Sequence, residues 1–301
     1  MFMRSVGWLI MPAAVACAAW GETSASANAG TFEQTRRISD NMVVLDGRTY
    51  PDPLVLSDGT PVSTTSQWLD ARRSELLELF QDQVYGYLLP EPLDISYTTS
   101  EIYHETCTLK KVEISLTGEH GTASFLVRVF VPHGISEPVP AFLLIDNRGA
   151  SSDDPSTPDD PDFFPVEQGI ARGYAMAAFH HRDVARDEWK DTAGHFRTPM
   201  INLFYAPGDT LPQNAGRAVS AWAWGAMRVM DYFQTDPDID ESRVAVIGHS
   251  RCGKTALWAG AMDPRFAMVV GNGTGCTGAR LNRRYTPGSE TLDTINTFYP
   301  S

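Results

Sequence analysis

Residues 248–255, Gly-His-Ser-Arg-Cys-Gly-Lys-Thr, are compatible with two incompatible structures. Letter by letter, the stretch matches G-x-x-x-x-G-K-[ST], the phosphate-binding P-loop. It also places Ser250 two residues after Gly248 and just after the apolar run RVAVI (243–247), which is typical of a sharp strand-to-helix turn that exposes a nucleophilic serine. The first interpretation predicts a nucleotide-binding protein, and the second predicts an esterase.

The position of the motif in the chain favours the serine elbow. A P-loop normally follows an early strand and needs a later apolar strand that ends in an acid to hold Mg²⁺. Here the motif begins at residue 248, and the next apolar run, RFAMVVGNGTG (265–275), contains no acid. The stretch departs from G-x-S-x-G at one point, because Cys252 stands where the second glycine is expected, but Cys is small enough for a tight turn. We therefore interpret the P-loop match as coincidental.

The patterns around the motif predict an α/β protein. Two alternating runs, 107–118 and 122–134, indicate an antiparallel pair of strands. The almost wholly apolar run 139–146 is typical of a strand buried on both faces of a parallel sheet. An early helix is expected within 65–90, and helices and strands then alternate through 163–173, 174–180, 214–234, 242–247, 252–262 and 265–271. This order predicts an α/β-hydrolase fold, a mostly parallel central sheet with flanking helices.

Composition excludes some classes of partner. The chain has 301 residues, and its 24 Lys and Arg against 37 Asp and Glu give a net charge of −13. Nucleic acid and anionic membrane both require a basic surface, so neither is expected as the main partner. Nothing in the sequence decides the oligomeric state.

The N-terminal residues resemble an export signal. A positive start, MFMR, is followed by the apolar stretch 5–20 and by small residues near Ala27 and Ala29. We expect a signal peptide over 1–27, a single domain over 28–301 and a secreted or periplasmic protein with no membrane association after the signal is removed. Lipoprotein anchoring at Cys17 is the less favoured alternative. Cys107, Cys252 and Cys276 remain after removal, so at least one thiol is unpaired within the chain, and the pairing stays open.

The motif and its flanks resemble the glucuronoyl esterases, carbohydrate esterase family 15, of the bacterial type. The resemblance lies in VAVIGHSRCGKTALWAGAMDPRFAMVVGN (244–272), which contains the Gly-x-Ser-Arg-x-Gly-Lys signature, and is supported by 219–232, 275–284 and YPDPLVLSDGTPV (50–62). It implies a serine carboxylic-ester hydrolase that acts on glucuronate esters of xylan, such as the bond between glucuronoxylan and a lignin alcohol. No cofactor or metal is implied.

Three residues carry the expected chemistry. Ser250 is the candidate nucleophile, although a serine after a strand can also serve only as a helix N-cap. The backbone N–H of Arg251 follows the nucleophile and faces the developing oxyanion, and the resemblance implies that its guanidinium assists. A second oxyanion donor is expected near Asn147–Gly149. The resemblance also implies that Lys254 binds sugar hydroxyls, whereas a lone helical lysine is more often solvated.

Two other segments suggest metal sites, but a structural role is favoured for both. Adjacent side chains on a strand point to opposite faces, so His180 and His181 at the end of a predicted strand are not expected to share an ion. The loop 151–162, with five Asp and three Pro, could bind Ca²⁺, but a solvated loop is favoured.

The catalytic pattern is incomplete. In α/β-hydrolases the chain order is Ser, acid, His, yet none of the seven histidines follows Ser250. Gly273 stands where many family members have a glutamate. We therefore expect a chain truncated at its C-terminus, without its last strands, acid and histidine, whose own activity is uncertain. The alternatives are an acetylxylan or other carbohydrate acyl esterase, and an inactive, truncated glycan-binding remnant.

Overall fold

The computed structural model describes residues 36–39, 42–45, 47–156, 162–188, 194–280 and 287–298. Two compact units divide the chain, Met1–Phe80 and Gln81–Ser301. The expected signal peptide lies outside the described residues, and the expected single domain over 28–301 stays a prediction. Among the described residues, no helix is long and apolar enough to cross a membrane.

The first unit contains a small antiparallel sheet and a helical segment. The sheet has the order β1 (Arg36–Ser39), β2 (Met42–Leu45), β3 (Arg48–Pro51), and sequence patterns did not predict it. The helical segment consists of α1 (Thr65–Gln67), the π-helical η1 (Trp68–Arg72) and α2 (Arg73–Phe80). It begins at a capping box, in which the Thr64 hydroxyl accepts the Gln67 N–H and the Gln67 side chain accepts the Thr64 N–H. The predicted early helix is confirmed here.

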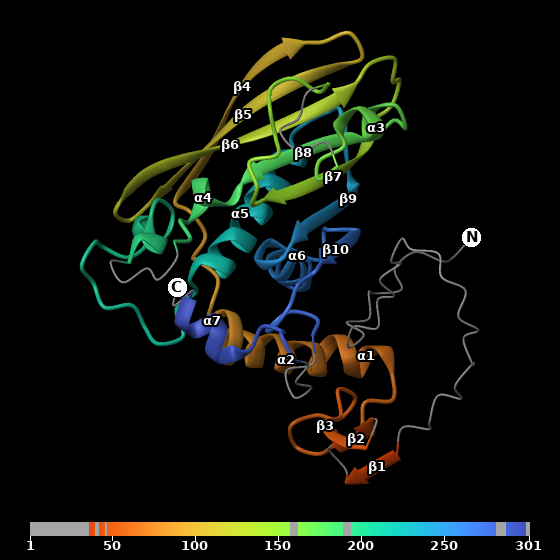
Figure 1. Ribbon diagram of the computed structural model, residues 1–301, viewed down its shortest axis with the longest axis vertical. Coiled ribbons are helices and arrows are strands. Elements are labelled where there is room, and N and C mark those ends of the chain that lie inside the picture. Colours follow the sequence, from red (N-terminus) through yellow and green to blue (C-terminus); the bar gives the residue numbers. More distant parts are fainter. Residues whose placement is uncertain are drawn as a thin grey trace. The chain divides into compact units, whose positions relative to one another are not determined.

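The second unit is built on a seven-stranded sheet with the order β10-β9-β7-β8-β6-β5-β4 (Figure 1). Strands β7 to β10 run parallel, and β4, β5 and β6 add antiparallel pairs at one side. The strands are β4 (Asp94–Tyr103), β5 (Cys107–Gly118), β6 (Gly121–Pro132), β7 (Val139–Asp146), β8 (Ala175–His180), β9 (Ile239–His249) and β10 (Met268–Asn272). The expected α/β-hydrolase sheet is confirmed. Strand β4 was not predicted, because its sequence is polar and its last six residues are all exposed.

Helices lie on both faces of this sheet and confirm the predicted βα alternation. They are α3 (Val166–Ile170), α4 (His181–Val184), α5 (Ala218–Phe233) and α6 (Arg251–Met262), and a further helix, α7 (Leu292–Phe298), comes after the last strand. Three short helical turns accompany them, the π-helical η2 (Gln81–Tyr85) and the 3₁₀ turns η3 (His195–Arg197) and η4 (Ile201–Leu203).

The alternation of side chains in β5 separates the two faces. Leu109 packs with Phe130 and with Val166 of α3 in one buried cluster. The neighbouring Lys110 points to the other face, where its Nζ lies 2.6 Å from Asp236 Oδ1, directly after α5. Helices α5 and α6 therefore cover one face of the sheet, and α3 covers the opposite face.

Helix α5 is buried on nearly all sides. The sequence predicts a single apolar stripe that includes Val219, Trp222 and Phe233, but the structure also buries Ser220, Arg228 and other residues off that stripe. A helix that is apolar almost all round belongs in the interior. Helix α5 packs against β5, β7 and β9 of the sheet.

Strand β10 is the last strand of the sheet on its side among the described residues. Val269 packs against Gly260 of α6, where an added Cβ would lie 2.2 Å from Val269 Cγ2. The alternate residues Met268 and Val270 are 47% and 37% exposed. Parallel strands are usually covered on both faces, so the Met268 side of β10 is an uncovered apolar surface.

Candidate active site

Ser250 occupies the sharp turn between β9 and α6. Its backbone has φ 55° and ψ −121°, a conformation that a residue with a Cβ rarely adopts. The Ser250 N–H donates to the Asn272 carbonyl at the end of β10 (2.8 Å), which fixes the turn to the neighbouring strand. Its side chain makes no helix-capping hydrogen bond. The helix N-cap alternative therefore does not account for this serine.

Gly248 and Gly253 make the turn possible. A Cβ on Gly248 would lie 2.0 Å from the Cys252 carbonyl oxygen, and one on Gly253 would lie 2.8 Å from the Asn272 oxygen. Cys252, at the position of the expected glycine, is fully buried, and burial raises the pKa of its thiol. A protonated, inaccessible thiol is a poor nucleophile, so Cys252 does not compete with Ser250 as the candidate nucleophile of this motif.

Arg251 is the first residue of α6, and its guanidinium is paired. Its Nη1 forms an ion pair with Asp187 Oδ2, and the side chains of Arg251 and Asp187 are 26% and 2% exposed. The Asp187 carbonyl also accepts a hydrogen bond from Arg182 Nη2 at 3.1 Å. Sequence patterns did not identify Asp187, because it lies 64 residues before its partner in an irregular segment.

Lys254 is buried rather than solvated, with 4% of its surface exposed. Its Nζ lies 3.6 Å from Glu290 Oε2. Burial lowers the pKa of Lys254, and the nearby Glu290 carboxylate opposes that effect only in part. Sequence reasoning gave Glu290 no role, because a salt bridge between positions 36 residues apart leaves no local pattern.

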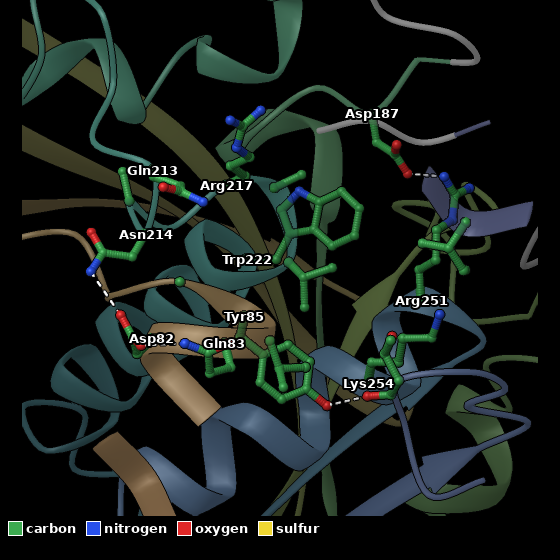
Figure 2. Close-up of a pocket in the computed structure, with 17 residues that line it drawn as sticks. Asp82, Gln83, Tyr85, Asp187, Gln213, Asn214, Arg217, Trp222, Arg251 and Lys254 are labelled. Atoms are coloured by element: carbon green, nitrogen blue, oxygen red, sulfur yellow. Dashed lines mark hydrogen bonds and ion pairs between the residues drawn. The ribbon is translucent and has the colours of Figure 1, made fainter. Parts of the chain in front are cut away.

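Arg251 and Lys254 both face one cavity of about 440 Å³. Figure 2 shows them on one side of it, with Trp222 and Arg217 at the back and Asp82, Gln83, Gln213 and Asn214 on the opposite side. Tyr85 forms part of the wall, and its hydroxyl donates to the Thr277 carbonyl at 2.6 Å while its ring stacks on Trp258. Burial raises the pKa of Tyr85 to about 12, so its hydroxyl stays protonated near neutral pH. The wall therefore combines hydrogen-bonded polar side chains with apolar ones, among them Val219, Trp222 and Ile295.

A buried carboxylate engages the segment expected to supply the second oxyanion donor. Asp146, at the end of β7, is fully buried, and its Oδ1 accepts the backbone N–H groups of Arg148 (2.8 Å) and Gly149 (3.1 Å). The Asn147 side chain donates to the His249 carbonyl at 3.2 Å instead. The Asp146 carboxylate therefore engages two of the amides in this segment, and a second oxyanion donor near Asn147–Gly149 stays a prediction.

His180 and His181 do not point to opposite faces. Strand β8 ends at His180 and α4 begins at His181, so the alternation of a strand no longer applies, and the ring centroids lie 4.8 Å apart. His181 is buried against Trp222, and its Nδ1 lies 2.9 Å from the Asp146 carbonyl oxygen. Burial lowers the pKa of His181 to about 3, so Nδ1 is the protonated donor of a neutral ring.

His249 and Gly273 lie together beside the elbow. A Cβ on Gly273 would lie 3.2 Å from His249 Cε1, and Gly273 has φ +56°. The ring of His249 meets Phe163 edge to face at 5.9 Å, and its Nδ1 is buried without a hydrogen-bond partner among the described residues. Burial lowers the pKa of His249, and Arg148 adds to this effect.

The acidic loop contributes to the fold in its described part. Asp153 accepts hydrogen bonds from Lys111 and Arg128 on β5 and β6, both at 2.6 Å, and these bonds lower the pKa of its carboxyl. Residues 157–161 lie outside the described residues. Within the described ranges, no group of three or more His, Cys, Asp or Glu is placed to hold a metal ion. Cys107, Cys252 and Cys276 are all buried, and none of them forms a disulfide bond in the described part of the chain.

Comparison with known proteins places this site in a family. The family described as glucuronyl esterase, fungi, matches residues 114–298, which include the elbow, the cavity lysine and Glu290. The chain belongs to the glucuronoyl esterase family. Carbohydrate esterase MZ0003, from an unknown prokaryotic organism, is 32% identical over 89% of this chain and 68% of its own length. The 4-O-methyl-glucuronoyl methylesterase 1 of Wolfiporia cocos is 32% identical over 76% of this chain, which spans only 50% of that protein.

Solved structures of glucuronoyl esterases have the same fold. The glucuronoyl esterase from Solibacter usitatus superimposes with a TM-score of 0.72 at 31% identity, over 83% of this chain and 70% of that one. A promiscuous CE15 esterase from a marine bacterial metagenome gives 0.69 at 30% identity, over 89% and 70%. The resemblance read from the GHSRCGK motif is confirmed, and so is the class of carboxylic-ester hydrolases to which the family belongs.

Proposed function

We propose that this glucuronoyl esterase family member cleaves esters of glucuronate with Ser250 as its nucleophile. The observation that carries the proposal is the Ser250 backbone, with φ 55° between β9 and α6. That conformation holds the hydroxyl clear of helix capping at the carboxyl edge of the parallel strands, where ligands of such sheets bind. Strain of this kind is kept where the exposed group has a chemical task.

The reaction follows from the groups beside Ser250. Its Oγ attacks the ester carbonyl carbon, and the bond to the alcohol oxygen breaks as the alcohol leaves with a proton. Water then hydrolyses the acyl-serine and releases glucuronate. The Arg251 N–H and guanidinium stabilise the oxyanion of each tetrahedral intermediate. None of the seven histidines follows Ser250, so the usual Ser, acid, His order has no counterpart among them.

Lys254, which lines the cavity, and the neighbouring Glu290 form the candidate sugar-binding group. An ammonium donates hydrogen bonds and a carboxylate accepts them, so together they match a sugar hydroxyl, which does both. Their separation of 3.6 Å leaves each with capacity for a further partner. Lys254 loses hydration by burial, and a bound sugar hydroxyl restores one of its lost hydrogen bonds.

The relatives suggest the natural substrate. Those named 4-O-methyl-glucuronoyl methylesterase support a glucuronate ester of xylan, and a lignin alcohol is the leaving group that we propose. Export by the signal over residues 1–27 would bring the enzyme to such a polymer, in the periplasm or outside the cell.

A labelling experiment tests the nucleophile directly. A fluorophosphonate probe should form an adduct at Ser250, located by peptide mass spectrometry and absent from S250A. Methyl glucuronate should slow labelling by competing for the cavity, and K254M should abolish this protection. Absence of an adduct at Ser250 after prolonged labelling of the folded chain would overturn the proposal.

The same experiment separates the alternatives. Protection by acetylated xylo-oligosaccharides, but not by methyl glucuronate, would favour an acetylxylan esterase, for which Lys254 has no required role. Binding of glucuronoxylan without any adduct at Ser250 would favour an inactive glycan-binding protein.

A further inference from the structure

The guanidinium proposed to stabilise the oxyanion does not act as a lone cation. Asp187 lies in the wall of the same cavity and pairs with Arg251 Nη1 (Figure 2). Asp187 follows α4, and the hydrogen bond from Arg182 Nη2 to its carbonyl helps to hold this segment in place. The two charges therefore face the ligand as a pair.

Burial makes the pair electrostatically strong. Only 2% of the Asp187 side chain is exposed, so water gives its charge little compensation. A buried carboxylate needs a partner, and the Arg251 guanidinium supplies it. Solvent and salt screen such a pair far less than they screen a surface ion pair. In return, Asp187 cancels much of the positive field that Arg251 would exert in the cavity.

That cancellation matters because substrate and product differ in charge. The ester of glucuronate is neutral at its carbonyl group, whereas the product is a carboxylate whose full negative charge is shared by the two oxygens on the same carbon. An uncompensated arginine binds a carboxylate strongly, often through two nitrogens at once. Here Asp187 already engages one N–H of Nη1, which leaves fewer guanidinium N–H groups for a two-nitrogen contact with the product.

We infer that Asp187 is a positioning residue that makes the site discriminate against its own product. It holds the Arg251 guanidinium in the cavity wall and neutralises it enough that free glucuronate binds weakly relative to the neutral ester. The inference rests on the proposed function, because it takes the cavity to be the site of the glucuronate ester.

Calorimetric titration of two ligands tests this role. Methyl glucuronate and glucuronate are titrated into S250A, which cannot turn over the ester, and into S250A/D187N. We expect D187N to tighten glucuronate binding about tenfold while changing ester binding less than about threefold, because only the anion gains from an uncompensated guanidinium. Adding R251Q to this variant should remove the gain.

Asp82 provides the matched control. It lines the same cavity on the side opposite Arg251, where its Oδ1 accepts a hydrogen bond from Asn214 Nδ2 at 3.0 Å (Figure 2). D82N removes one negative charge from the cavity, as D187N does. If net charge alone governed glucuronate binding, D82N would give the same tenfold gain, and that result would overturn the specific role of Asp187.

Other outcomes are equally decisive. If D187N leaves the ratio of the two affinities unchanged, the inference is wrong while the proposed function stands. If S250A binds neither ligand, both the proposed function and the inference are wrong. Should D187N not fold, as judged by circular dichroism, R251Q in the S250A background replaces it. That variant leaves Asp187 without its partner and should weaken glucuronate about tenfold more than the ester, and an equal loss would contradict the inference.

Discussion

Lys254 Nζ lies 3.6 Å from Glu290 Oε2, and this contact joins the helix that begins at the nucleophile to the segment before α7. Glu290 is itself held in place, because its Oε2 accepts the Cys276 N–H and its carbonyl accepts a hydrogen bond from Arg280. The buried ammonium therefore has a fixed acceptor on one side and the cavity on the other.

Replacement of this lysine should separate ligand binding from stability. K254M is expected to weaken methyl glucuronate binding about tenfold or more, because it removes a charged hydrogen-bond donor. It should also raise Tm at pH 7 by a few degrees, since burial of the charge disfavours the folded state. E290Q, which keeps an acceptor, is the matched variant and should lose less affinity. Calorimetry and thermal unfolding measure the two effects, and a K254M protein that is less stable at pH 7 would contradict this prediction.

The stabilising effect of K254M should depend on pH in one direction. The folded pKa of Lys254 lies below its usual value of 10.5 because of burial. Between those two values the unfolded chain binds more protons, so the wild-type protein gains stability as the pH rises. The difference in unfolding free energy between K254M and wild type should therefore shrink as the pH rises toward 10.5. Urea titrations across that range test it, and a constant difference would exclude Lys254 as the cause.

His181 should contribute an acid-side loss of stability. Its pKa falls to about 3 in the folded protein from a usual value of 6.5, so below pH 6.5 the unfolded chain takes up a proton that the folded protein does not. Stability is then lost as the pH falls, by up to about 1.4 kcal/mol per pH unit for one group.

H181N tests this because an asparagine amide can still donate to the Asp146 carbonyl but does not titrate. Its unfolding free energy should change less between pH 7 and pH 5 than that of the wild type. H180N, at an adjacent position whose side chain is less buried, is the control. It should alter the dependence of unfolding free energy on pH much less than H181N does. Equal slopes in H181N and wild type would show that another group governs the acid side.

The positive φ of Ser250 should lower the free energy of unfolding. Positive φ costs a residue with a Cβ about 1–2 kcal/mol, whereas glycine adopts it freely. S250G should therefore be more stable than S250A by roughly 1 kcal/mol after the greater chain entropy of glycine is subtracted. Both variants lose the labelled hydroxyl. Chemical denaturation compares them, and an S250A protein as stable as S250G would contradict the strained turn.

Gly248 should tolerate no side chain. The added methyl group of G248A would lie 2.0 Å from the Cys252 carbonyl oxygen and 2.3 Å from its carbon, both of which are backbone atoms. We expect a loss above about 3 kcal/mol or failure to fold. G134A is the control, because a Cβ there meets nothing within 4 Å and only the φ of +73° opposes it. It should lose about 1 kcal/mol, and a similar loss in both variants would argue against the tight elbow.

Local patterns predicted the parts of this protein that depend on local physics. The apolar run before Gly248, the small residues around Ser250 and the helix after it are adjacent in the sequence, so the elbow could be recognised and placed. Helix α5 was predicted for the same reason. Its burial on nearly all sides was not predicted, because the apolar pattern of a helix does not show which elements pack against each of its faces. Strand β4 escaped notice because an edge strand with exposed polar residues lacks the apolar alternation that marks a strand.

The partners of the site residues could not be predicted in the same way. Asp187 and Glu290 lie 64 and 36 residues from Arg251 and Lys254, and only the folded sheet brings them together. Nothing local reveals that the Asp146 carboxylate accepts the N–H groups of Arg148 and Gly149, so which group near Asn147–Gly149 is the second oxyanion donor could not be predicted. The side-chain directions of His180 and His181 were misjudged because β8 ends at His180 and α4 begins at His181, so the alternation of a strand does not extend to His181.

The three buried thiols of the described chain can report the local unfolding of the regions around them. Cys252 lies within the first turn of α6, Cys107 at the start of β5 and Cys276 beside Glu290, so each reports on a different region. In a C17S variant, a thiol reagent can react only as each region opens, and the rate of each modification reads out that local event. Mass spectrometry would therefore measure the rate of local unfolding at the elbow, at the start of β5 and at the Glu290 segment. The measurement needs no dye or engineered label.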